Sequence, residues 1–417
     1  MVNENSKCET WDFKPLNDYL DLLTDYDANG SFADMAANVH TEWGHGYAWY
    51  VRATDLEQNL SMADVRYADE YSYKFLEKTS LFGGELLMVK RGEIGKIYFF
   101  QMRSKYATLA PNLYLLKLND GMDSRFLYYY FLSGEGQKKI KTINASTSLG
   151  AIYKDDVKKL LVPALDIKEQ KRIAETLTGI DSLITKLQEL IVKKKNMRQG
   201  TMQMLVTGKK RLDGFSGEWI TKPLEKLCDL ITDGSHESPS EYLDGFYMPS
   251  VKDMTDNGFD FSDCKRISKA DYERLVANGC KPEIGDVLIA KDGSMLKYVF
   301  PVKENRNIVI LSSIAILRPK KNMLSSSYLT YYFRQPRFVE QVIKSNQTGT
   351  GVPRIVLKNF KKIELRIPEK LNEQEAIAGI LSDMDIDILT LEKKLKKLMA
   401  IKQGMMEELL TGKVRLM

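Results

Sequence analysis

Two Thr-Gly-Lys runs are the first candidates for chemistry in this sequence, because a glycine-rich loop with a lysine can cradle a phosphate. They are Thr207-Gly208-Lys209 and Thr411-Gly412-Lys413. A phosphate-binding loop also needs a glycine five residues before its Gly-Lys pair and a Ser or Thr directly after the lysine. Gly200 lies too far from Gly208, and Lys209 is followed by Lys210. The two runs are therefore better explained as helix ends.

Metal, cofactor and catalytic motifs are equally unsupported. His40 and Glu42 form an H-x-E pair, but the Pro-Cys-x-x-Cys run that a zinc deaminase also needs is missing. No CxxC pair, dinucleotide-binding fingerprint or Asn-Pro-Pro-aromatic methyltransferase motif occurs. We therefore predict no metal site, no cofactor and no catalytic residue in this chain. Trp43, Trp49 and Tyr50 could stack on nucleic-acid bases, and packing in a core explains them equally well.

Composition narrows the class of protein. The 417 residues include 61 Lys and Arg against 56 Asp and Glu, a net charge of +5. This is less than the strongly basic footprint of a protein that holds DNA alone, so partner chains are expected to share the neutralisation of phosphates. No uninterrupted apolar stretch is long enough to span a membrane, and the first residues lack the apolar core of a signal peptide. We expect a cytoplasmic protein that does not engage a membrane.

The elements that would position any site occur twice along the chain. Identical residues between Glu169-Gln170 and Arg211-Leu212 recur at one constant offset of 204. A second set, which includes Trp11 and Thr24-Asp25, recurs at an offset of 208 as Trp219 and Thr232-Asp233. The interiors between these matches, roughly residues 26–80 and 234–280, do not resemble each other. Such self-similarity predicts two domains with one frame and different contents.

Each repeat closes with a long helix. Asp166 and Asn372 are expected N-caps, and Gly208 and Gly412 are expected stops. Apolar residues at alternating spacings of three and four form a/d seams, which favour an antiparallel coiled coil of the two helices. The alternative is that each helix packs on its own domain as an ordinary core helix. The predicted helix-pair interface consists of Ile173, Leu177, Ile180, Ile184, Leu187, Ile191, Ile377, Leu381, Met384, Ile388, Leu391 and Leu395.

The segments before the helices mix short β-rich runs with helical stretches around residues 124–142 and 326–345. This mixture predicts an α+β fold with two similar domains of ordinary size. The predicted divisions are a first domain at 1–165, a central spacer helix at 166–212, a second domain at 213–370 and a C-terminal spacer helix at 371–417.

These combined features resemble the specificity (S) subunits of Type I restriction-modification systems. Two similar halves each end in Pro, Glu-Gln, Ile-Ala, Leu and Asp, followed by a heptad helix that closes in Thr-Gly-Lys. The resemblance covers essentially the whole chain. Further matches lie in the second half at Thr232-Asp233-Gly234-Ser235-His236-Glu237-Ser238-Pro239, Gly285-Asp286-Val287-Leu288-Ile289-Ala290-Lys291-Asp292-Gly293-Ser294 and Gly349-Thr350-Gly351-Val352-Pro353-Arg354.

The first half departs from the second in two of these motifs. It has Asn29-Gly30-Ser31-Phe32 where the second half has Asp233-Gly234-Ser235-His236, so it lacks the His. It also has Ser146-Thr147-Ser148-Leu149-Gly150-Ala151-Ile152 where the second half has Pro353 and Arg354. We therefore expect the two halves to read different DNA sequences.

The resemblance implies that each α+β segment is a target recognition domain for one half of a bipartite, asymmetric site in double-stranded DNA. It implies that the paired helices hold the two domains at a fixed separation. It also implies two methylation (M) subunits, which carry S-adenosylmethionine and methylate adenine, and restriction (R) subunits, which consume ATP. The chain itself would be a non-catalytic subunit.

Candidate DNA contacts are polar and basic side chains in these motifs and next to the short strands. The plainer alternative for each is a solvated surface residue or a turn former. The candidates are Asn29, Ser31, Arg52, Lys90, Arg91, Ser235, His236, Ser238, Lys252, Lys291, Ser294 and Arg354. A basic run near the first helix end could be a solvated face or a phosphate or partner contact; it consists of Lys193, Lys194, Lys195, Arg198, Lys209, Lys210 and Arg211.

Two other functions remain open at this point. A DNA-modifying enzyme with an unrecognised active site would need clustered acids with a lysine, or a cofactor loop. A coiled-coil scaffold would dimerise with other chains and bind no DNA.

Overall fold

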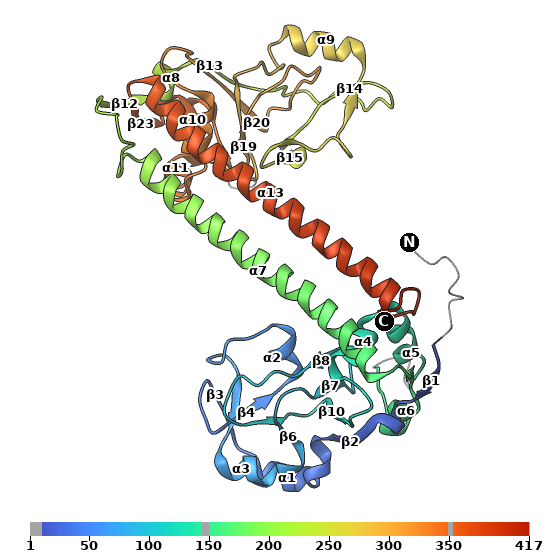
Figure 1. Cartoon of the computed structure of the whole chain (residues 1–417). Helices are drawn as coiled ribbons and strands as arrows, with labels where there is room; N and C mark the ends of the chain where they lie inside the picture. Colours follow the sequence, from blue (N-terminus) through green and yellow to red (C-terminus); the bar gives the residue numbers. More distant parts are fainter. Residues whose placement is uncertain (1–10, 144–149, 349–352, 417) are drawn as a thin grey trace. The chain divides into compact units, whose positions relative to one another are not determined.

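The computed structural model describes residues 11–143, 150–348 and 353–416. Within them the chain forms two compact units, one of residues 11–188 with 394–416 and one of residues 189–393. Each unit combines one α+β domain with the beginning of the long helix that follows it and the end of the other long helix. Figure 1 draws the first domain in blue to cyan and the second in yellow-green to orange.

A four-stranded antiparallel sheet forms the centre of the first domain, with the strand order β2, β10, β7, β8. Both of its faces are covered. Met88 of β7 belongs to a core with Phe126, whereas the neighbouring Leu87 belongs to a core with Trp49. Alternate side chains of one strand therefore join two different cores. The strands are β2 (Leu20–Asp25), β7 (Leu86–Val89), β8 (Ile97–Phe99) and β10 (Leu113–Leu118).

Helices cover one face of this sheet. The Asp123 carboxylate accepts hydrogen bonds from the amides of Arg125 and Phe126 and so caps the first helix of this layer, α4. The antiparallel strand pair β1–β11 lies beside them and leads into the long helix α7. These elements are α4 (Ser124–Leu132), α5 (Gly134–Thr142), α6 (Lys154–Lys159), β1 (Phe13–Pro15) and β11 (Leu161–Pro163).

A five-stranded sheet covers the other face, and most of it comes from the segment that has no match in the second half. Its order is β3, β5, β4, β9, β6, in which only β4 and β9 run parallel. Trp49 of β4 is fully buried and packs 5.4 Å from the Phe100 ring. The elements are β3 (Thr41–Trp43), β4 (Ala48–Val51), β5 (Arg66–Ala68), β6 (Ser80–Leu81), β9 (Ala107–Leu109), α1 (Phe32–Asn38), α2 (Ala53–Glu57) and α3 (Glu70–Phe75).

The second domain repeats the central frame. Its antiparallel sheet has the order β13, β20, β18, β19, which corresponds strand for strand to the first sheet, and β12–β23 corresponds to β1–β11. The prediction of two similar α+β domains is therefore confirmed. The elements are β12 (Trp219–Pro223), α8 (Leu224–Leu227), β13 (Cys228–Asp233), β18 (Val287–Ala290), β19 (Val299–Pro301), β20 (Ile314–Pro319), α10 (Ser326–Phe333), α11 (Pro336–Asn346), α12 (Leu357–Lys362) and β23 (Glu364–Pro368).

The unmatched interiors share part of their strand pairing despite their different sequences. In the first domain β4 pairs antiparallel with β5 and parallel with β9. In the second, β14 pairs antiparallel with β17, and Tyr247 of β14 forms a parallel bridge to Ile308. The remaining elements here are β14 (Phe246–Tyr247), β15 (Met254–Thr255), β16 (Gly258–Phe259), β17 (Arg266–Ile267), α9 (Lys269–Ala277), β21 (Gln347–Thr348) and β22 (Arg354–Ile355).

The long helices α7 (Ile167–Val206) and α13 (Leu371–Leu409) pair in opposite directions, which confirms the predicted antiparallel coiled coil. In the first unit Asp181 of α7 contacts Lys402 of α13 at 2.7 Å. In the second unit Lys194 of α7 contacts Asp387 of α13 at 3.2 Å. The twelve predicted interface residues are all buried or half-buried.

Both expected packing modes of the helices occur. Ile173 and Leu177 of α7 join the core of the first domain together with Met406 and Leu409 from the end of α13. In the second unit the start of α13 and the end of α7 enter the core of the second domain in the same way. Each helix therefore begins on its own domain and ends on the other one.

The helix ends differ in part from the prediction. Asp166 caps α7, since its carboxylate accepts the Lys168 amide at 2.8 Å. The predicted cap at Asn372 is wrong, because α13 already begins at Leu371 and Asn372 lies inside the helix. Gly208 and Gly412 follow the helix ends with φ of +72° and +76°, a conformation that glycine adopts without strain. No helix among the described residues is long and apolar enough to cross a membrane.

Candidate nucleic-acid interface

Lys90, predicted to contact DNA, is committed to a buried ion-pair cluster at the end of β7. Its Nζ lies 2.7 Å from Asp25 and 2.8 Å from Asp27, and only 7% of its side chain is exposed. Lys154 approaches the same Asp25 carboxylate at 2.6 Å. Burial alone would raise the pKa of Asp25, but the hydrogen bonds and charges of Lys154 and Lys90 outweigh it and lower this pKa.

Lys291 occupies the equivalent position at the end of β18 in the second domain. Its Nζ lies 3.3 Å from Asp233 and 3.2 Å from Asp292, and its side chain is again 7% exposed. Lys90 therefore links the end of β7 to the end of β2 through Asp25. Lys291 links the end of β18 to the end of β13 through Asp233. A phosphate would have to compete with these carboxylates, so a DNA contact by Lys90 or Lys291 stays a prediction without added support.

We expect the Asp25→Asn variant to destabilise the first unit by about 3 kcal/mol, because it leaves two ammonium groups, one of them buried, without their shared carboxylate. Since the folded pKa of Asp25 lies below its unfolded value near 3.8, the stabilisation is present above that pH. It is lost as pH falls through the folded pKa.

Hydrogen exchange resolved by peptide measures this effect separately in the two units. Asp233→Asn is the matched control, since it should raise exchange in the second unit only. Equal protection of Asp25→Asn and the unsubstituted protein would contradict the structural role of this cluster.

The Asp-Gly-Ser-His loop of the second domain is positioned by backbone contacts. A Cβ on Gly234 would lie 2.0 Å from the Ile310 carbonyl oxygen, so only glycine fits here. The buried Ser235 hydroxyl donates to the Glu237 carbonyl at 2.8 Å and accepts the Glu237 amide at 3.0 Å. His236 is exposed, with Nε2 3.3 Å from Asp233. Of this loop, His236 presents the side chain most available to a ligand.

The corresponding loop of the first domain ends in a helix cap. Asn29 donates to the Thr79 hydroxyl at 2.9 Å and is half-buried. Ser31 caps α1, with its hydroxyl accepting the Asp34 amide and the Asp34 carboxylate returning to the Ser31 amide. Both predicted contacts therefore have structural tasks in the loop.

The remaining candidates are more accessible. Lys252 and Arg91 are exposed. Ser238 is exposed and accepts a hydrogen bond from Lys265 Nζ at 2.8 Å. Arg52 is half-buried and paired with Asp55 at the end of β4.

A backbone ladder brings the Lys-Asp-Gly-Ser loop and Arg354 together in the second domain. Asp292 forms an antiparallel bridge with Arg354, and the Gly293 amide donates to the Pro353 carbonyl at 2.8 Å. Arg354 is exposed, and Ser294 follows this ladder half-buried. The ladder therefore brings the exposed Arg354 beside the Lys-Asp-Gly-Ser loop, in which Ser294 is half-buried and Lys291 is buried.

The first domain has the same backbone ladder but no arginine at the position of Arg354. Arg91 bridges Ala151, and the Gly92 amide donates to the Gly150 carbonyl at 2.9 Å. Ala151 thus stands where the second domain has Arg354. The preceding motif residues, 144–149 and 349–352, lie outside the described part of the chain.

The repeated Glu-Gln pair has a structural explanation that its sequence did not reveal. Glu373 is buried and forms a two-point ion pair with Arg211, with Nε to Oε1 at 3.0 Å and Nη2 to Oε2 at 2.5 Å. In the first unit Glu169 and Arg415 form the same pair at 2.6 and 2.7 Å. The Arg after each Thr-Gly-Lys run therefore anchors the end of one helix to the start of the other.

Gln170 and Gln374 occupy matching buried positions beside these ion pairs. The Gln170 side chain accepts the Asp123 amide at 2.8 Å and donates to the Leu165 carbonyl at 2.9 Å. Gln374 accepts the Ser325 amide at 2.9 Å in the same manner. Both glutamines thus connect the first turn of a long helix to the helix layer of its domain.

Most of the basic run on α7 pairs with α13. In the second unit Lys195 contacts Glu392 at 2.7 Å and Arg198 contacts Asp385 at 2.8 Å, in addition to the Lys194–Asp387 and Arg211–Glu373 contacts. Lys193, Lys209 and Lys210 are exposed. Acids on the partner helix therefore explain most of the run, whereas no ion pair is found among the described residues for Lys193, Lys209 and Lys210.

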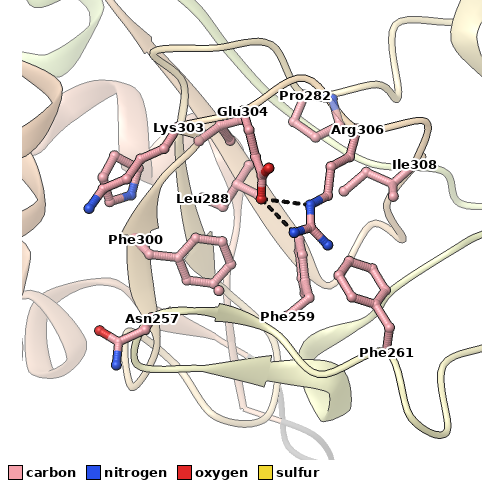
Figure 2. Close-up of a pocket in the computed structure, with 13 residues that line it drawn as sticks. Asn257, Phe259, Phe261, Pro282, Leu288, Phe300, Lys303, Glu304, Arg306 and Ile308 are labelled. Carbon is pink, nitrogen blue, oxygen red and sulfur yellow. Dashed lines mark hydrogen bonds and ion pairs between the residues drawn. The ribbon is translucent and has the colours of Figure 1, made fainter. Parts of the chain in front are cut away.

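The second domain also contains a cavity of about 210 Å³ between the β15–β16 hairpin and β18–β19 (Figure 2). Phe259 and Phe300 meet edge to face at 5.1 Å in its wall. Across the cavity Glu304 accepts a hydrogen bond from Arg306 Nε at 2.8 Å. Glu304 is the single carboxylate among the lining residues, so the lining has no acid pair for metal-assisted or acid–base chemistry. Among all described residues, no group of three or more His, Cys, Asp or Glu is placed to hold a metal ion.

This chain is similar to known proteins in sequence and in fold. A model of the Type I restriction modification DNA specificity domain matches residues 9–194 and again 217–400. A Methanocaldococcus jannaschii chain described as the MjaX type I restriction enzyme specificity subunit is 24% identical over 98% of this chain and 94% of its own. The MjaVIII specificity subunit of the same organism is 36% identical over 41% of this chain and 36% of its own.

Solved structures share the fold of this chain. The S subunit of a Type I restriction-modification system from M. genitalium matches with a TM-score of 0.59 at 16% identity, over 98% of this chain and 97% of that chain. A chain from a structure of type I R-M complex assembly and conformational transition matches with a TM-score of 0.56 at 14% identity, over 97% and 99%. With two copies of the specificity domain spanning most of its length, the chain belongs to the Type I restriction-modification DNA specificity family.

Proposed function

We propose that this chain is the DNA-recognition subunit of a Type I restriction-modification complex and directs adenine methylation and restriction by partner subunits. Its two recognition domains, 1–165 and 213–370, would each read one half of a bipartite, asymmetric site. The spacer helices, 166–212 and 371–417, would hold them apart. Two methylation subunits with S-adenosylmethionine and restriction subunits that consume ATP would supply the chemistry.

One observation carries this proposal. The two domains share a central sheet, a helix layer and a pair of anchoring ion pairs, whereas the segments outside this frame differ in sequence and in side chains. A constant frame with variable contents is what a protein needs to present two different reading surfaces from one scaffold. An enzyme would instead need one assembled set of reacting groups.

Mapping methylated adenines across the genome of a host with and without this gene tests the proposal. We expect one bipartite, asymmetric motif to be methylated only when the gene is present. Identical methylation in both strains, with the partner subunits expressed, would overturn it.

We also expect the purified chain alone to transfer no methyl group and to cut no DNA. A nuclease needs acids that hold a metal, and among the described residues no group of three or more His, Cys, Asp or Glu is placed to do so. A methyltransferase needs a cofactor-binding motif, and the sequence shows none that is recognisable. Incorporation of labelled methyl groups into DNA, followed with and without added methylation subunits, measures this. Transfer by the isolated chain would contradict a non-catalytic role.

A further inference from the structure

Trp43 is an exposed indole in a domain that buries its other tryptophans. Its exposed fraction is 54%, whereas Trp11 and Trp49 are 7% and 0% exposed. It ends β3, the edge strand of the five-stranded sheet in the first domain. A large aromatic face left in water on an edge strand is typical of a contact surface rather than of a core.

Two arginines lie over this ring. The Arg52 and Arg66 guanidinium carbons are 4.6 Å and 4.9 Å from the Trp43 ring centroid, within cation–π distance. Arg66 stands directly opposite Trp43 in the β3–β5 register. The strand pairing therefore fixes which guanidinium meets the indole.

The two arginines differ in how many of their guanidinium N–H groups donate hydrogen bonds within the protein. Arg52 donates through both Nε and Nη2 to Asp55, which is fully buried, so its charge is matched and it serves to hold the ring. Arg66 donates to the Thr41 hydroxyl at 3.0 Å. Among the described residues no carboxylate lies within ion-pair distance of Arg66. A guanidinium has five donors, so most of those on Arg66 remain available in a fixed orientation.

We propose that Trp43 and Arg66 form a DNA contact of the first recognition domain, an inference that rests on the proposed function. The Arg66 guanidinium would bind a pair of acceptors on DNA, either phosphate oxygens or the O6 and N7 edge of a guanine. The indole holds the guanidinium in place and packs against the same strand of DNA. Trp43 and Arg66 lie in the segment with no match in the second half, so this contact belongs to one half-site only.

The test uses the complex of this chain with its methylation subunits and duplexes that carry the mapped site. We expect Arg66→Gln to weaken binding roughly ten- to a hundredfold, and Arg66→Lys to recover part of the loss because the charge returns without the planar fork. Trp43→Phe should weaken binding less than Arg66→Gln. Trp43 is exposed and Arg66 is half-buried with one side-chain hydrogen bond, so thermal unfolding should change little in all variants.

Lys117→Gln is the matched control, because Lys117 lies 4.8 Å over the exposed Phe82 ring elsewhere on the same domain. It should leave affinity and the methylated motif unchanged.

The salt dependence of DNA affinity distinguishes a phosphate contact from a guanine contact. For a phosphate contact, Arg66→Gln lowers the slope of log affinity against log salt by about one and weakens all sequences alike. For a guanine contact, the slope persists and the methylated motif relaxes at one position of one half-site. Either result supports the proposal. Affinity and motif equal to those of Lys117→Gln, in a complex that otherwise binds DNA, would overturn it, whereas an unsubstituted complex without DNA binding would overturn the proposed function itself.

Discussion

Replacing residues 1–160 by the corresponding segment of a related subunit should change one half of the methylated motif and leave the other half intact. The reason is that the exchanged segment contains the first central sheet and its variable sheet, while the second domain has a core of its own. Each mismatched base pair costs about 1–3 kcal/mol in protein–DNA recognition. Several mismatches in one half-site should therefore remove methylation of the original motif below detection.

The packing of the long helices sets a condition for this exchange. The first core includes Ile173 and Leu177 of α7 and Met406 and Leu409 of α13, all outside the exchanged segment. A donor with apolar residues of similar size facing them should fold, and one with polar residues there should not. Methylation mapping reads the outcome, with the retained half-site as internal control. A change in both halves at once would show that the domains do not read DNA independently.

Inserting one heptad into each long helix should lengthen the spacer between the half-sites without changing the half-sites. The sharpest design repeats residues 182–188 after Gln188 and residues 387–393 after Lys393, because the chain passes from one compact unit to the other at these positions. The added copies continue the a/d seam through Ile184, Leu187, Ile388 and Leu391.

Seven residues lengthen a helix by about 10 Å, and base pairs rise about 3.4 Å each. The upper limit is therefore roughly three base pairs. A smaller change, down to about one base pair, follows if the domains must also turn with the groove, since a heptad rotates a straight helix by about 20° relative to the seam.

The same heptad placed in α7 alone is the control, because α13 then has no matching length and the ion pairs of one unit must break. That variant should lose methylation. Genome-wide methylation mapping gives the spacer length directly. An unaltered spacer in a double-insertion variant that still methylates would show that the helices do not set the distance.

Much of the architecture follows from the sequence by itself. The constant offset of 204 between matching residues implies two copies of one helix, and the spacing of apolar residues predicts their pairing as a coiled coil. The absence of recognisable catalytic motifs and the modest charge pointed to a subunit that works with partners. The inferences of the repeat and of the helix pair are confirmed, because periodicity and repetition are local properties that the sequence displays directly.

The roles of individual polar residues were decided by the tertiary structure. The sequence predicts Lys90 and Lys291 as DNA contacts. The pairing of β7 with β10 and of β18 with β20 places each lysine beside a carboxylate from the first strand of its sheet, Asp25 or Asp233. A local sequence pattern cannot predict an ion pair with a carboxylate that lies about sixty residues away in the sequence.

The same limit explains why no role for the Glu-Gln pairs followed from the sequence and why two explanations stayed open for Trp43. Glu169 and Arg415 lie 246 residues apart and meet because α13 runs back along α7 onto the first domain. Arg66 meets Trp43 through the register of β3 and β5, which β4 and α2 separate in the sequence. The sequence by itself determined the repeat, the helix seam and the class of protein. The tertiary structure decided which charges are paired within the fold and which remain exposed, because that depends on burial and on contacts between distant segments.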